Sequence, residues 1–108
     1  MATLQLDPRS GQRTHRETVA AGATSQPLLL PHGLQHVSII VSPGATGTAR
    51  VEYTLDPHAD VEAGAATVKW IPWPHGDVGV DTMEMPAGPI SALRCVAATV
   101  DAEWRVLV

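Results

Sequence analysis

Residues 37–55 read VSIIVSPGATGTARVEYTL, and they indicate the fold class more clearly than any other part of the chain. Apolar side chains occupy every second position at 37–41 and again at 51–55. This period of two is typical of half-buried antiparallel strands. Residues 42–47, which lie between the two runs, contain one proline and two glycines. They predict a hairpin loop that joins neighbouring strands, with the glycines at positions where φ turns positive.

The same alternation recurs along the chain, whereas helical periodicity is nearly absent. Residues 103–108 alternate clearly, and further strand candidates are residues 3–6, 17–20, 26–30, 66–71, 78–80 with 82–85, and 90–99. We find no window free of Pro and Gly with apolar residues at the i, i+3, i+4 and i+7 positions of a helix. About eight short strands separated by turns predict an all-β fold, either a small antiparallel β-sandwich or a jelly-roll-like barrel. Immunoglobulin-like and jelly-roll topologies both fit this strand count.

Length and composition bound the size of the domain. The chain has 108 residues, which fits a single domain with one thin core. Charged residues make up 17% of the chain, below the usual quarter, which favours a surface buried against a partner. We expect residues 1–16 to form an extended N-terminal strand or arm and residues 17–108 to form the sandwich body.

Charge is distributed unevenly along the sequence. The net charge of −4 argues against general nucleic-acid binding. Arg9, Arg13 and Arg16 lie close together near the N-terminus, whereas acidic residues dominate the middle of the chain. A basic arm on an acidic body indicates contact with a neighbouring molecule and a homo-oligomer. The alternative is a solvated loop with scattered charges.

The segment Trp70-Ile71-Pro72-Trp73-Pro74 combines aromatic rings with proline. Pro72 and Pro74 lack a backbone donor, so we expect an edge strand that runs into a rigid turn. Trp70 and Trp73 have opposite parity, so at least one ring can point outward. An exposed ring here suits a protein contact or a sugar-stacking platform. The alternative is that both rings cap the core.

The residues predict no catalytic, cofactor or metal site. The five histidines lie in turns, in the N-terminal segment, or too far apart along a strand to share a metal ion. We find neither a nucleophile elbow, nor a phosphate-binding glycine loop, nor the acidic pattern of a calcium loop. Cys95 is the single cysteine and lies in an apolar run, so we expect a buried thiol and no internal disulfide. The expected role is therefore binding and not catalysis.

Several segments in order resemble a known class of proteins. They are VSIIV at 37–41, SPGATGTARVEYTL at 42–55, the Trp-Pro segment, GPISALR at 88–94 and WRVLV at 104–108. This set resembles small β-sandwich virion proteins of tailed bacteriophages, most closely the capsid decoration (cement) proteins. The resemblance covers about residues 37–108, and phage tail and adaptor sandwiches share its turn and core patterns. It implies a protein that joins a capsid shell, often as a symmetric oligomer, and clamps neighbouring subunits.

The sequence thus leads to one functional hypothesis and two alternatives. We expect a structural virion protein that binds the major capsid protein on the outside of the shell and bridges neighbouring subunits. The alternatives are a tail or head–tail connector component and a carbohydrate-binding module. The predicted partner contacts are Arg9, Arg13, Arg16, Trp70 and Trp73. With no signal peptide and no membrane-length apolar run, we expect synthesis in the host cytoplasm and a final location in the virion.

Overall fold

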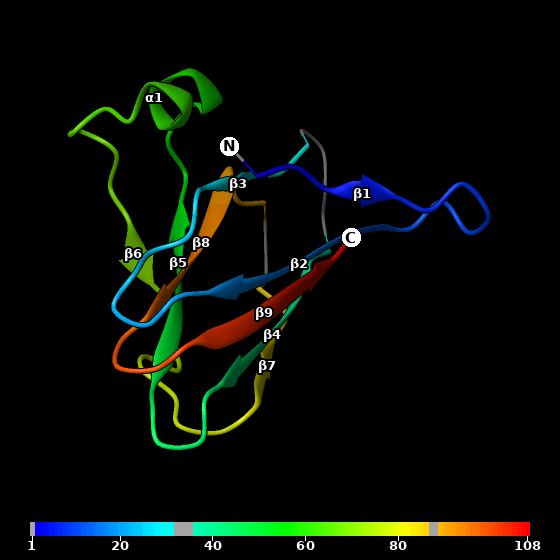
Figure 1. The fold of residues 1–108 in the computed structure, drawn as a ribbon. Helices are drawn as coiled ribbons and strands as arrows, with labels where there is room; N and C mark the ends of the chain where they lie inside the picture. Colours follow the sequence, from blue (N-terminus) through cyan, green and yellow to red (C-terminus); the bar gives the residue numbers. More distant parts are fainter. Residues whose placement is uncertain (1, 32–35, 87–88) are drawn as a thin grey trace.

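In a computed structural model that describes residues 2–31, 36–86 and 89–108, nine strands form two antiparallel sheets packed face to face (Figure 1). The five-stranded sheet has the order β1 (Gln5–Leu6), β2 (Arg13–Val19), β9 (Ala102–Leu107), β4 (Ser38–Pro43) and β7 (Thr82–Glu84). The four-stranded sheet has the order β3 (Leu28–Leu29), β8 (Ala92–Ala97), β5 (Ala49–Thr54) and β6 (Ile71–Pro72). This arrangement confirms the predicted small all-β sandwich.

The strand order identifies the topology. Without β1, the two sheets run β2-β9-β4-β7 and β3-β8-β5-β6, so the chain crosses between the sheets at most of its connections. Two four-stranded sheets wound in this way form a jelly roll. Of the two topologies compatible with the sequence, the structure therefore has the jelly roll.

The core follows from the alternation in the sequence. Inward side chains of both sheets are almost completely buried, among them Ile39, Val41, Val51, Leu93, Cys95, Trp104 and Val106. Full burial of each aliphatic side chain stabilises the fold by about 1.5–3 kcal/mol. Leu55, which we expected on the buried face, is 73% exposed because β5 ends one residue earlier, at Thr54.

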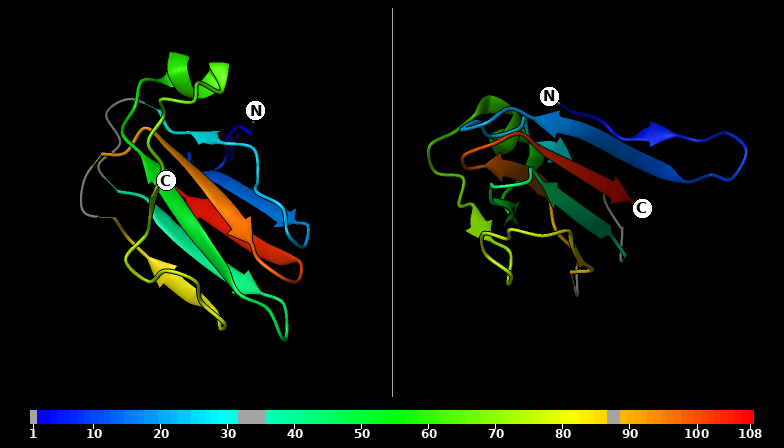
Figure 2. Two further views of the ribbon diagram at one scale, coloured as in Figure 1. Left: turned by 90° about the vertical axis from the view of Figure 1, so that its left-hand side faces the viewer. Right: turned by 60° about the horizontal axis from the view of Figure 1, so that its bottom comes forward.

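The predicted hairpin at residues 42–47 is wrong. β4 and β5 belong to different sheets, so the connection crosses from one sheet to the other. It stacks on the β8–β9 connection, where the Gly44 N–H donates to the Asp101 carbonyl oxygen at 3.0 Å. The loops after β2, β4 and β8 lie side by side at this end of the sandwich (Figure 2, left). Alternation defines strands but does not tell which sheet a strand joins, and this caused the error.

Gly44 and Gly47 let this connection lie close against the β8–β9 connection, and neither is needed for a positive φ. The glycines with positive φ are Gly11, Gly22, Gly64 and Gly76 among the described residues. A Cβ at Gly44 would lie 2.8 Å from the Asp101 carbonyl oxygen, and a Cβ at Gly47 would overlap the Val100 side chain. The space between the β4–β5 and β8–β9 connections therefore has no room for a methyl group at either position.

The N-terminal segment is a β-hairpin that starts within the body and projects from it (Figure 2, right). Its turn is held by the Asp7 carboxylate, which accepts hydrogen bonds from the Arg9 N–H at 2.9 Å and the Ser10 hydroxyl at 3.1 Å. β2 pairs with β9 from Thr14 to Val19, so no boundary exists after residue 16 and the predicted division into arm and body is corrected. The sequence showed only the end of this strand, within the candidate at 17–20, because residues 13–18 are polar on both faces.

The structure differs from the sequence prediction at two further places. Helix α1 (His58–Ala63) was missed because six residues are too few to show a helical repeat. The strand expected at 66–71 is absent except for its last residue, Ile71, which begins the predicted edge strand β6. Within the described ranges, no helix is long and apolar enough to cross a membrane.

Candidate functional site: the outer face of the five-stranded sheet

Neither tryptophan of the predicted contact segment presents a free ring. The Trp73 side chain is 2% exposed and its Nε1–H donates to the Gly76 carbonyl oxygen at 2.6 Å. Trp73 is therefore a core residue, and its prediction as a partner contact is corrected. Trp70, which directly precedes β6, is partly buried, with the Arg94 guanidinium 4.3 Å from its ring centroid. This cation–π contact covers one face of the ring.

The three predicted arginines do not form one cluster. Arg9 is exposed in the turn of the β1–β2 hairpin, and Arg13 is exposed at the start of β2. Arg16 lies on the outer face of the five-stranded sheet, directly opposite Arg105 of β9. Sequence reasoning missed Arg105, although it lies between the buried Trp104 and Val106 and must therefore point outward.

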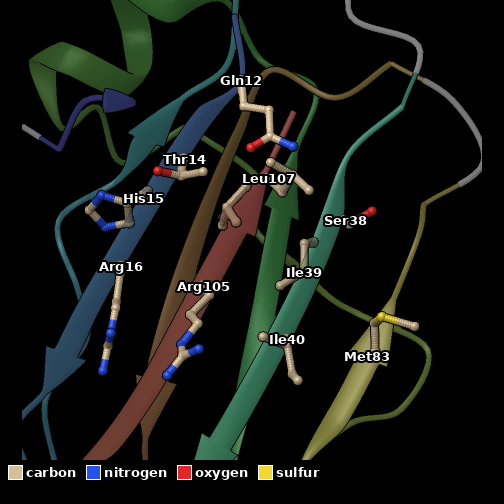
Figure 3. Close-up of a pocket in the computed structure, with 11 residues that line it drawn as sticks. Gln12, Thr14, His15, Arg16, Ser38, Ile39, Ile40, Met83, Arg105 and Leu107 are labelled. Carbon is tan, nitrogen blue, oxygen red and sulfur yellow. The ribbon is translucent and has the colours of Figure 1, made fainter. Parts of the chain in front are cut away.

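A row of four side chains crosses this outer face at one level. The strand register pairs Arg16 with Arg105, Arg105 with Ile40, and Ile40 with Met83. One half of the row is basic and the other half is apolar, and both halves face outward (Figure 3). The register therefore joins four strands that are distant in sequence into one surface.

The apolar half of the row lines a shallow groove of about 470 Å³. Its wall includes Leu107, which is 40% exposed, and Met83, which is 62% exposed, beside the partly buried Ile40. Gln12, which precedes β2, and Thr14, which lies in β2, line the upper end of the groove (Figure 3). Methionine is flexible and polarisable and so adapts to varied partners, which makes this groove suitable for binding a protein surface.

The basic half of the row carries more positive than negative charge. The Glu103 carboxylate lies between the two cations, 2.7 Å from Arg105 Nη2 and 3.3 Å from Arg16 Nη2. Hydrogen bonds from Arg105 and then Arg16 lower the pKa of Glu103, so it is ionised at neutral pH. The side chains of Arg16 and Arg105 remain 65% and 55% exposed. One carboxylate facing two arginines leaves donor groups free for a partner.

Two histidine–glutamate pairs lie at the edges of the sandwich. His15 Nε2 is 2.9 Å from Glu17 Oε1, which also accepts the Trp104 Nε1–H at 3.0 Å. His75 Nε2 is 3.1 Å from Glu84 Oε2. In the described part of the chain, no group of three or more His, Cys, Asp or Glu side chains is placed to hold a metal ion. The pairs satisfy polar groups beside the core.

The single thiol is inert in this fold. Cys95 is fully buried in β8, as its apolar surroundings in the sequence predicted. Burial, with a smaller contribution from the Glu17 charge, raises the pKa of the Cys95 thiol to about 12. The thiol is therefore protonated at neutral pH and does not act as a nucleophile.

Comparison with known proteins adds no family assignment. No protein-family model matches the chain, and no curated protein matches it. The geometry and charge of the outer face thus carry the functional argument.

Proposed function

We propose that this protein is a structural virion protein that docks on the outside of a phage capsid and stabilises the shell by bridging neighbouring subunits. The observation that supports docking is the exposed groove formed by Ile40, Met83 and Leu107 beside two exposed arginines. In a soluble domain, an apolar patch with a polar rim marks a surface that binds a partner. The virion as the location rests on the resemblance of residues 37–108 to decoration proteins.

Bridging needs a second contact, and the β1–β2 hairpin supplies it. The hairpin projects from the body and presents Leu6, which is 62% exposed, and the exposed Arg9 (Figure 2, right). A rigid body that contacts one subunit with its sheet and another with its hairpin binds both more tightly than either alone. Such binding stabilises the assembled shell because only the assembled state offers both contacts.

The two alternatives make different demands on the surface of the protein. A tail or head–tail connector component would use the same surfaces, and a ring-shaped oligomer in solution would favour it. A carbohydrate-binding module needs an exposed aromatic platform. None of the four aromatic side chains, all within the described ranges, is exposed: Trp73 and Trp104 are buried, and Tyr53 and Trp70 are partly buried. No observation therefore favours the carbohydrate alternative.

Co-sedimentation with purified capsids of candidate phages tests the proposal. We expect saturable binding at a fixed ratio to the major capsid subunit, together with a raised temperature of capsid disruption. Saturation shows a lattice site, and the raised temperature shows that binding stabilises the shell. Absence of binding to every capsid form, including expanded shells, would refute the decoration role.

A further inference from the structure

The two halves of the outer-face row define the chemistry of what binds there, and this inference rests on the proposed docking role. We propose that the face binds an acidic, amphipathic segment of a partner protein. A carboxylate of that segment pairs with Arg16 and Arg105, while a neighbouring apolar side chain enters the groove between Ile40, Met83 and Leu107.

The charge of the row selects an anion. Two arginines directly opposite each other on neighbouring strands repel, and Glu103 offsets only part of that repulsion. A second carboxylate from a partner would relieve the rest and would find free guanidinium donors. The partner is thus acidic at this point, although the chain itself carries a net charge of −4.

The same charges disfavour a second copy of this chain stacked face to face. An isologous contact centred on the arginines would bring Arg16 and Arg105 of both copies together, which makes four cations against two Glu103 carboxylates. A contact between two copies of this chain is therefore better made by another surface. This leaves the face free for a different protein.

The apolar half of the row favours a protein segment over nucleic acid as the ligand. A phosphate backbone offers negative charge but little apolar surface that could enter the groove. Met83 lies in the same row as Arg105, two strands away across β4. Leu107 lies on the same strand as Arg105, two residues further along. A segment with adjacent acidic and apolar side chains would contact both halves at once.

Fluorescence anisotropy with three labelled polymers tests this selection on the full chain. The probes are a glutamate–tyrosine copolymer, polyglutamate and a lysine–tyrosine copolymer. We expect saturable binding of the glutamate–tyrosine copolymer, weaker binding of polyglutamate and no binding of the lysine–tyrosine copolymer. A DNA duplex that competes more strongly than the glutamate–tyrosine copolymer, or equal binding of the basic copolymer, would overturn the inference.

Matched variants locate the binding. Arg105→Glu and, separately, Arg16→Glu should each weaken binding of the glutamate–tyrosine copolymer by at least about tenfold, because each replaces attraction by repulsion. Lys69→Glu makes the same charge change at an exposed position in the loop after α1 and should leave affinity within about twofold. Equal weakening by Lys69→Glu would show an effect of net charge alone and would contradict the site.

The capsid assay separates this inference from the proposed function. Capsid binding that persists unchanged in Arg105→Glu and Arg16→Glu overturns the acidic partner but leaves docking on the capsid intact. Copolymer binding that responds to these variants, with no capsid binding at all, supports the acidic partner and refutes the virion role.

Discussion

The Glu52 carboxylate on β5 accepts a hydrogen bond of 2.7 Å from Arg94 Nε on the neighbouring strand β8. Arg50 Nε donates to the same carboxylate at 2.9 Å, and Arg50 Nη1 donates to Asp77 Oδ1 at 3.2 Å. The outer face of the four-stranded sheet thus neutralises its own arginines. On the outer face of the five-stranded sheet, Arg16 and Arg105 share one carboxylate, so positive charge remains. This difference supports our proposal that this face is the docking surface.

Replacing Glu52 tests how far this ion network stabilises the fold. Glu52 is 6% exposed, so Glu52→Gln leaves two arginines without their shared anion at a nearly buried site. We expect a loss of about 1.5–3 kcal/mol in the free energy of unfolding, measured by urea denaturation. Glu62→Gln on the exposed side of α1 is the control and should change it by less than about 0.5 kcal/mol. If Glu52→Gln and Glu62→Gln have the same free energy of unfolding, the ion network does not stabilise the fold.

The glycines of the β4–β5 crossing should not tolerate alanine. Gly44→Ala and Gly47→Ala each force a methyl group into the stacked crossings, and we expect a loss of about 1–3 kcal/mol of stability. Gly79→Ala places its methyl group 3.9 Å from the nearest atom and should change stability by less than about 1 kcal/mol in either direction. If Gly44→Ala and Gly47→Ala change stability as little as Gly79→Ala does, the two loops do not stack.

Stability should fall at alkaline pH because two buried groups resist ionisation. Burial raises the pKa of Cys95 from 9.0 to about 12, and burial together with the Glu84 charge raises the pKa of Tyr53 from 10.0 to about 12. Since the unfolded chain loses these protons first, the stabilisation is complete below about pH 9 and is lost between about pH 9 and 12. Denaturant titrations across this range measure it.

Two variants assign this dependence to the groups concerned. Cys95→Ala and Tyr53→Phe should each flatten the fall of unfolding free energy with pH, whatever their effect at neutral pH. Tyr53→Phe should cost little at neutral pH, because the buried Tyr53 hydroxyl has no hydrogen-bond partner. A pH dependence that both variants leave unaltered would show that other groups cause it.

The sequence predicted the strands better than their connections. Alternation in 37–41 and 103–108 placed β4 and β9 because their inward residues are uniformly apolar. β2 was only partly found, since its inward His15 and Glu17 are polar and are satisfied by each other and by Trp104. Which strands pair depends on contacts between residues far apart in the chain, and a period of two does not encode them.

The candidate face was predicted only through Arg16. The sequence drew attention to arginines and tryptophans as residue types, yet Trp73 is part of the core because the turn after β6 directs it inward. The face instead depends on register, which brings Arg16, Arg105, Ile40 and Met83 into one row. Two further signals were visible in the sequence, because Ile40 and Leu107 are apolar residues on the otherwise polar sides of their strands.

Met83→Asp tests whether the outer face of the five-stranded sheet docks on the capsid. This variant puts a charge into the groove at a side chain that is 62% exposed, so the fold should tolerate it. Leu55→Asp makes a similar change at a side chain that is 73% exposed and lies outside the face. In co-sedimentation with capsids, we expect Met83→Asp to lower occupancy at least about tenfold and Leu55→Asp to match the unmodified protein. Full capsid occupancy by a folded Met83→Asp variant would show that this face does not dock on the capsid.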